Sequence, residues 1–91
     1  MQFEWDEEKA IINFKKHGIA FEEAVGCFYD PYQVAFEDPE HSEDEFREIL
    51  IGHSKMGKLL IIVYSLRDKV IRIISARSAT KKEAKTYAEG I

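Results

Sequence analysis

The stretch Leu59-Leu-Ile-Ile-Val-Tyr-Ser-Leu66, followed by Arg67-Asp-Lys69 and then by Val70-Ile-Arg-Ile-Ile-Ser-Ala-Arg77, is the most apolar part of the 91-residue sequence. β-Branched and aromatic residues are frequent in both apolar runs, and the short charged segment between them is typical of a turn. We therefore predict a β-hairpin with strands over residues 58–66 and 70–78.

Upstream of the hairpin, the sequence has the signals of an N-terminal helix. Asp6 is a good N-cap, Gly18 a good C-terminal stop, and apolar residues recur at helical spacing over residues 7–17. At 100° per residue, three apolar positions form the expected buried face of this helix. These positions are Ala10, Ile11 and Phe14.

The remaining elements complete an α+β pattern within one domain over residues 1–91. Thr80 and Glu83 form a capping box that predicts a C-terminal helix. A short extended segment is expected near residues 3–5. The other predicted elements are a second helix over 21–28, strands over 32–36 and 46–51, and the C-terminal helix over 81–89. The expected fold has two N-terminal helices, a mostly antiparallel four-stranded sheet and a C-terminal helix.

The charge of the chain is divided between its two halves. Residues 1–50 carry 14 of the 17 acidic and 4 of the 13 basic side chains, whereas residues 51–91 carry 3 acidic and 9 basic ones. The formal net charge of −4 argues against a protein that coats nucleic acid. The basic second half could still hold a polyanion, or the two halves could neutralise each other within one compact fold.

Several kinds of site are disfavoured by the sequence. The three histidines, His17, His41 and His53, lack the spacing of a metal site, and no phosphate-binding glycine loop or nucleophile elbow is present. No metal and no cofactor are expected. Cys27 lies in an apolar segment that favours a buried structural thiol. The sequence near Met1 does not resemble a signal peptide, and no apolar run is long enough to span a membrane, so we expect a cytoplasmic protein.

Three arginines, Arg67, Arg72 and Arg77, lie within the apolar hairpin. A guanidinium is rarely buried without a partner, and its planar set of donors fits a phosphate group. The alternative is an ion pair with Asp68 or with N-terminal carboxylates. Unless a bulge intervenes, strand alternation places Arg72 and Arg77 on opposite faces. We therefore prefer Arg77, together with Arg67 at the turn, as phosphate ligands.

Two basic residues of the first helix, Lys9 and His17, could transfer protons. Cleavage of RNA without a metal needs a base for the 2′-hydroxyl, an acid for the leaving 5′-oxygen and positive charge near the phosphate. Each residue also has a simpler explanation. Lys9 could be a solvated lysine, and His17 could be a cation that interacts favourably with the C-terminal end of the helix dipole.

The sequence resembles one known family. The segments Phe3-Glu-Trp-Asp6, Lys16-His-Gly18 and Arg72-Ile-Ile-Ser-Ala-Arg77, in that order, resemble the signature of the BrnT family of toxins from type II toxin–antitoxin pairs. The resemblance covers nearly the whole chain. It departs from the family at Ala84 and at some lysines, which stand where the family often has arginine.

The resemblance implies a RelE/ParE-like fold, an RNA-cleaving activity that stops translation, and a cognate antitoxin of the ribbon–helix–helix type. Operator DNA would be contacted indirectly, through the antitoxin. The expected catalytic residues are Lys9, His17, Arg67 and Arg77. The expected substrate-binding residues are Arg47, Tyr64, Lys81 and Lys82.

A second hypothesis is a non-catalytic module that acts through protein partners alone, as a ParE-like protein or an inactive toxin would. An interaction protein has no need for a Lys/His helix face together with an arginine hairpin. That combination favours the enzyme over the binding module.

Overall fold

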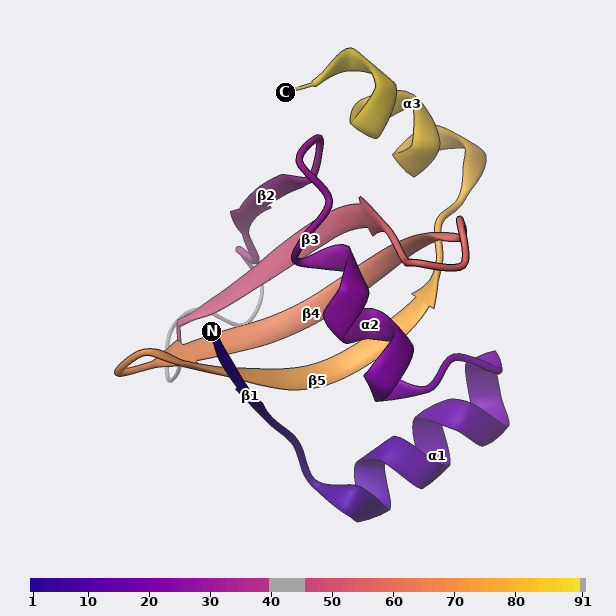
Figure 1. The fold of residues 1–91 in the computed structure, drawn as a ribbon. Helices are drawn as coiled ribbons and strands as arrows, with labels where there is room; N and C mark the ends of the chain where they lie inside the picture. The colour runs from indigo at the N-terminus through magenta and orange to yellow at the C-terminus, as the bar shows by residue number, and fades with distance from the viewer. Residues whose placement is uncertain (40–45, 91) are drawn as a thin grey trace.

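The computed structural model describes residues 1–39 and 46–90 and consists of three helices around one twisted sheet (Figure 1). Within these residues, no helix has the length and apolar character needed to cross a membrane. The strands are β1 (Gln2–Glu4), β2 (Val34–Glu37), β3 (Arg47–His53), β4 (Leu59–Arg67) and β5 (Val70–Ser78). The helices are α1 (Glu7–His17), α2 (Phe21–Cys27) and α3 (Lys81–Glu89).

The expectation of a four-stranded, mostly antiparallel sheet is wrong. The sheet has five strands in the order β1-β5-β4-β3-β2, and it is mixed because β1 runs parallel to β5. The pairing joins Phe3 to Ile71 and Glu4 to Arg72, residues from opposite ends of the chain. Three residues are too few to show a strand pattern, and the partner of β1 lies far away in the sequence. The edge strand was therefore expected only as an extended segment.

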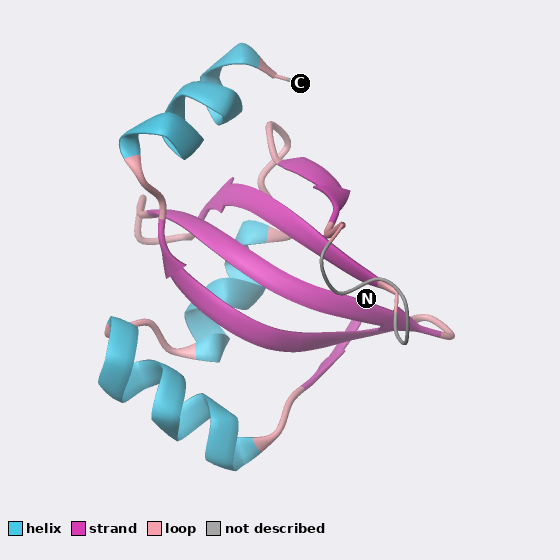
Figure 2. Cartoon of the chain, turned by 180° about the vertical axis from the view of Figure 1, so that it is seen from behind, coloured by secondary structure: helices cyan, strands magenta, loops and turns pink. Residues whose placement is uncertain are grey.

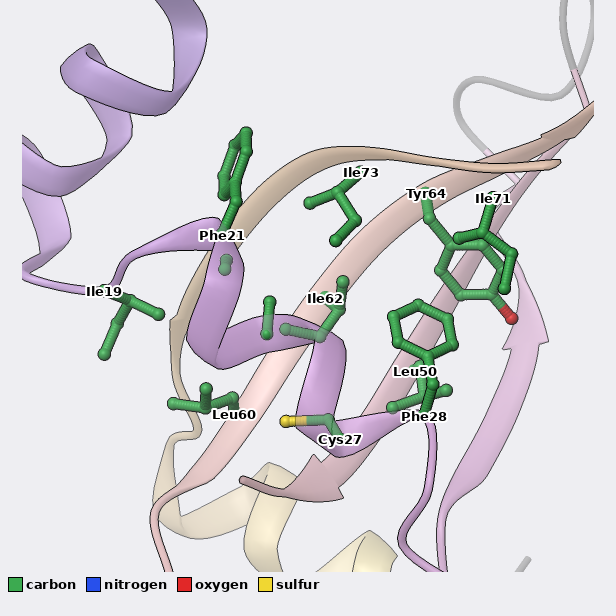
Figure 3. Close-up of a cluster of buried hydrophobic side chains, with 12 residues drawn as sticks. Ile19, Phe21, Cys27, Phe28, Leu50, Leu60, Ile62, Tyr64, Ile71 and Ile73 are labelled. Carbon is green, nitrogen blue, oxygen red and sulfur yellow. The ribbon is translucent and has the colours of Figure 1, made fainter. Parts of the chain in front are cut away.

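Helix α2 covers one face of the sheet, and the hydrophobic core lies between them (Figure 3). Phe21 and Cys27 from α2 are fully buried with Leu60 and Ile62 from β4. Gly52 in β3 permits this close approach, since a Cβ atom there would lie 2.9 Å from the backbone oxygen of Cys27. We call this side of the sheet the covered face.

Helix α1 begins and ends where the sequence predicts. Of its expected buried face, Ala10 packs against the core, whereas the prediction is wrong for the other two positions. Ile11 and Phe14 are 53% and 54% exposed, whereas Asn13 is 7% exposed. The Asn13 amide nitrogen donates to the backbone oxygens of Ala76 (2.8 Å) and Ile19 (3.1 Å), and its side-chain oxygen accepts from the Ala76 amide at 3.1 Å. The helix therefore lies beside the edge of β5, attached through a polar side chain, instead of packing its apolar stripe onto the sheet.

Helix α3 is held by polar contacts, and none of its nine described residues is buried. Tyr87 donates to Asp30 at 2.7 Å and lies 3.0 Å from the Nδ1 atom of His53. At the other end of the helix, Arg77 donates two hydrogen bonds to Glu83, at 2.8 and 2.7 Å. Burial and the hydrogen bond to Asp30 raise the pKa of Tyr87 to about 12, so its hydroxyl stays protonated as a donor.

A β-bulge in β5 changes the direction of its side chains. Val63 pairs with Ser75 and Tyr64 pairs with Ile73, so Ile74 has no residue opposite it on β4. The expectation that Arg72 and Arg77 lie on opposite faces is therefore wrong. The extra residue restores their alignment, and both point to the face opposite α2.

We predict that Asn13→Leu lowers the free energy of unfolding by about 2–4 kcal/mol, because it leaves backbone groups of Ala76 and Ile19 without partners. Urea unfolding followed by circular dichroism measures the change. Ile12→Ala is the matched control on the same helix. Ile12 is 63% exposed, so its replacement is expected to change the free energy by about 0.5 kcal/mol or less. Equal stability of the Asn13→Leu variant and the wild type would contradict the proposed anchor.

The pH dependence of stability provides a second test. Hydrogen bonds from Arg77 lower the pKa of Glu83 from 4.5 to about 2. A carboxyl group with a depressed pKa stabilises the fold fully above its ordinary pKa, and this stabilisation is lost as the pH falls toward about 2. Because the pair is partly exposed, the effect is expected to be about 1 kcal/mol or less.

Glu83→Gln should therefore lower the melting temperature at pH 6, and the difference from wild type should disappear toward pH 2. Glu89→Gln, an exposed carboxyl group on the same helix, is the control and should have no such pH-dependent effect. A constant difference between the wild type and Glu83→Gln at all pH values would exclude the ion pair as its cause.

Candidate functional site

The face of the sheet opposite α2, which we call the open face, carries most of the candidate residues. Figure 2 shows the molecule from this side, with α2 behind the sheet, α1 below it and α3 above it. Register and strand alternation assign the side chains to this face. The residues assigned to it include Phe36, Arg47, Ile49, Val63, Ser65, Arg67, Arg72, Ser75 and Arg77.

A row of polar residues crosses four strands of the open face. Arg47 pairs with Ser65, Ser65 pairs with Arg72, and Arg72 pairs with Glu4. We call Arg47, Ser65 and Arg72 the arginine row. Neighbouring Cβ atoms in such a row lie roughly 5 Å apart, so arginine side chains leave the sheet on both sides of the serine. Arg72 donates to Glu4 at 2.9 Å, and about a third of its side chain remains exposed.

The hydroxyl group of Ser65 is notable within this row. Ser65 is fully buried, and its Oγ atom has no hydrogen-bond partner within the described residues. Buried hydroxyl groups usually have a partner. Because the hydroxyl is buried, a ligand on the open face would meet the neighbouring arginine side chains and not this oxygen.

Beside the arginine row, the open face has a hollow of about 460 Å³. Its apolar floor comes from Ile49, Val63 and the bulged Ile74, and polar groups of Arg47 and Ser75 lie at its wall. Asp38 and Pro39 complete the lining. The hollow could hold a flat apolar group whose charged part contacts the arginine row.

The other two predicted arginines lie at different positions along the strands of this face. Arg67 is exposed and ends β4, one alternation step beyond Ser65. Arg77 pairs with Ile61, four residues along β4 from Ser65, or ~13 Å away. Its guanidinium binds Glu83, whose hydrogen bonds raise the pKa of Arg77 further. The structure thus brings Arg47, Arg67 and Arg72 together and separates Arg77 from them.

The two predicted proton-transfer residues lie ~80° apart around α1, on either side of Asn13. Asn13 faces β5, whereas Phe14 lines a hollow beside α2. At 100° per residue, Lys9 lies ~140° from Phe14, on the side turned away from α2 toward the open face, whereas His17 lies ~60° from Phe14. Both side chains are exposed. They are also about 12 Å apart along the helix axis, so the structure does not join them in one cluster.

The remaining predicted substrate ligands have different surroundings. Tyr64 is 5% exposed and belongs to the core on the covered face, where its hydroxyl donates to Glu48 at 2.7 Å. Burial and this hydrogen bond raise its pKa well above the usual range. Lys81 and Lys82 are exposed in the first turn of α3.

The described residues offer neither an accessible thiol nor a cluster of metal ligands. Cys27 is fully buried, and burial, with the charges of Glu23 and Asp30, raises the pKa of its thiol to about 12. The thiol is therefore protonated and inaccessible. Among residues 1–39 and 46–90, no three His, Cys, Asp or Glu side chains are grouped to hold a metal ion. His41 lies outside the described residues.

Sequence reasoning missed two members of the arginine row. Alternation along β5 does not show the bulge at Ile74, so it favours Arg77 over Arg72. Nothing in the sequence distinguishes Ser65 from an ordinary strand residue. The in-register pairing of Ser65 with both arginines becomes apparent only with the strand order. One serine between two arginines at the same level of three neighbouring strands would have been a usable signal if the register had been known.

Comparison with known proteins assigns the chain to a family. The family profile described as "Ribonuclease toxin, BrnT, of type II toxin-antitoxin system" matches residues 5–83. A crystal structure of the Brucella abortus ribonuclease toxin BrnT is similar in fold, with a TM-score of 0.60 and 24% sequence identity, covering 89% of this chain and 99% of the other. No curated protein sequence matches the chain. Because the profile match spans most of its length, the chain belongs to the BrnT family, ribonuclease toxins of type II toxin–antitoxin systems.

Proposed function

We propose that this chain is a metal-independent endoribonuclease that binds RNA across the open face and inhibits translation in the cytoplasm. The observation that carries this proposal is the pair Arg47 and Arg72, whose side chains leave the open face on either side of the buried Ser65. Guanidinium groups bind phosphate oxygens through parallel hydrogen bonds. Family membership supports RNA as the substrate.

The chemistry is an in-line displacement at phosphorus. The 2′-oxygen of a ribose attacks the adjacent phosphorus after losing its proton to a base, and the bond to the 5′-oxygen breaks as an acid protonates that oxygen. The products are a 2′,3′-cyclic phosphate and a 5′-hydroxyl. Negative charge grows on the phosphorus-bound oxygens in the transition state, so fixed cations there lower the barrier.

In this mechanism, the arginines act on the phosphate. Arg72 and Arg47 would hold its non-bridging oxygens from both sides of Ser65, and Arg67 would contribute a third charge from the end of β4. The apolar floor beside them, formed by Ile49 and Val63, suits the flat surface of a nucleobase. A strand of RNA could thus place a phosphate at the row and a base in the hollow.

For proton transfer, we assign the main role to Lys9, because helix geometry turns it toward the open face. His17 remains a candidate for the second proton transfer, at the C-terminal end of α1. Arg77 is assigned a smaller part in catalysis, since it lies ~13 Å along the strand direction from the level of Arg47 and Arg72. Lys81 and Lys82, beside that ion pair, would attract the RNA chain electrostatically.

The partner of a type II toxin is an antitoxin. We propose that it is of the ribbon–helix–helix type and that this chain meets operator DNA indirectly, through that partner. The net charge of −4 supports an indirect contact, since it disfavours binding of duplex DNA by this chain alone.

We predict that the purified protein, freed of antitoxin, cleaves RNA at an unchanged rate in the presence of EDTA, because its cations are side chains. Gel analysis of a labelled RNA gives the rate, and end-group analysis should identify cyclic phosphate products. Addition to a cell-free translation reaction should stop protein synthesis. Loss of cleavage in chelator, restored by a divalent metal, would overturn the metal-free mechanism. A folded protein without cleavage in either condition would favour a non-catalytic role.

The arginine row predicts a ranking of variants. Arg72→Ala and Arg47→Ala should each lower kcat by about 10²–10³-fold, as does the loss of one donor at a developing oxyanion. Arg77→Ala should have a smaller effect. Lys9→Ala should lose most activity, whereas its matched control Lys15→Ala, an exposed lysine on the α2 side of the same helix, should lose none.

Thermal unfolding of each variant separates lost folding from lost chemistry. Full activity of a folded Arg72→Ala variant, with an inactive but folded Arg77→Ala variant, would move the reacting phosphate from the row toward α3. Equal losses for Lys9→Ala and Lys15→Ala would remove the specific role of Lys9 and leave a general effect of positive charge on α1.

A further inference from the structure

A second surface, away from the open face, exposes large apolar side chains. Ile11 and Phe14 of α1 are 53% and 54% exposed, and Tyr29 and Met56 are 57% and 72% exposed. Two hollows separate these residues, one of about 280 Å³ between α1 and α2 and one of about 430 Å³ between α2 and the β3–β4 turn. Single exposed apolar residues are ordinary, but a contiguous group marks an interaction site.

The two hollows form one continuous surface. Ala20 and Glu22 line both of them, so the apolar lining runs from α1 across α2 to Met56. We call this surface the α1–α2 groove. Its position explains why α1 has an apolar stripe although the helix attaches to the sheet through Asn13. The stripe is directed to the groove, and a partner rather than the core would remove it from water.

Carboxylates accompany the apolar residues of the groove. Both helices begin with an acidic pair, Glu7 and Glu8 in α1 and Glu22 and Glu23 in α2. Three of these carboxylates line the hollows, against two lysines, Lys15 and Lys55. Apart from Lys55 and Met56, the groove lies in the half of the chain with 14 acidic and 4 basic side chains. A partner with basic residues beside an apolar stripe is complementary to it.

We propose that the α1–α2 groove is the docking site of the antitoxin, which places an amphipathic helix with basic flanks against Phe14 and Ile11. The inference rests on the antitoxin partner that family membership implies, and not on the cleavage site. An apolar helix face in a groove uses anchors spaced by three or four residues, as Ile11 and Phe14 are on the toxin side. Basic flanking residues would meet Glu7 and Glu22.

The position of the groove has a mechanical consequence. It lies on the α2 side of the molecule, whereas the arginine row lies on the open face. An antitoxin segment that fills the groove therefore anchors the partner without itself contacting the arginines. Inhibition then requires a second part of the antitoxin to reach across α1 or α3 to the open face.

Binding of the antitoxin encoded beside this gene tests the proposal. In isothermal titration of purified toxin variants with this antitoxin, Phe14→Asp should weaken the binding affinity by about 30-fold or more, which is the effect of losing a central interface residue. Ile12→Asp is the matched control. Ile12 is 63% exposed on the same helix but ~160° around it from Phe14, so its variant should bind within about threefold of wild type.

A second pair of variants tests charge. Glu22→Lys should slow association and reduce the dependence of the association rate on salt, whereas Glu37→Lys, an exposed residue of β2, should not. Because Phe14 is exposed, Phe14→Asp should melt near the wild-type temperature and cleave RNA at the wild-type rate. If it unfolds, Ile11→Ser replaces it as the test of the same stripe.

Wild-type affinity of folded Phe14→Asp or Ile11→Ser would overturn the proposal, as would an equal loss for Ile12→Asp. Sedimentation of the free protein tests whether a second copy of this chain occupies the groove instead. A dimer that Phe14→Asp abolishes and Ile12→Asp preserves would assign the groove to a second copy of this chain. Since binding is measured without RNA, failure of the proposed cleavage mechanism would leave these results unaffected.

Discussion

The extra residue at Ile74 determines which side chains in the second half of β5 point to the covered face and which point to the open face. Without it, Ala76 would leave the core and Arg77 would enter it, because a shift of one residue exchanges the two faces of a strand. With it, Ile71, Ile73 and Ala76 remain buried against α2, and Arg72, Ser75 and Arg77 share the open face. The hydrophobic core and the arginine row both depend on this bulge.

Much of the local structure could be predicted from sequence because its signals are local. Asp6 and Gly18 define α1, and the capping box of Thr80 and Glu83 defines the start of α3, as the structure confirms. The β4–β5 hairpin follows from its apolar runs and charged turn. The predictions that failed concern contacts between residues far apart in the sequence. The pairing of β1 with β5 and the attachment of α1 through Asn13 depend on contacts between distant residues, and periodicity carries no information about them.

The candidate site shows the same division between local and non-local information. Residue types alone identified Arg67 as a candidate for a phosphate site, whereas Arg47 became a candidate only through the family resemblance. Residue types could not identify Ser65 or include Arg72, because both acquire their positions from the register of three strands and from the bulge. The placement of Tyr64 in the core has a related cause. A tyrosine in a strand points to one of two faces, and the packing of α2 decides which one is buried.

The attachment of α3 has a consequence for how this molecule moves. A helix without buried residues, joined to the rest by an ion pair at one end and by the Tyr87–Asp30 contact at the other, can detach without opening the core. Its local opening free energy is therefore much smaller than that of the whole domain. Such an opening would uncover the part of the open face beneath the C-terminal helix. Long RNA segments could then enter beside it in its detached state, with β4 and β5 still intact beneath them.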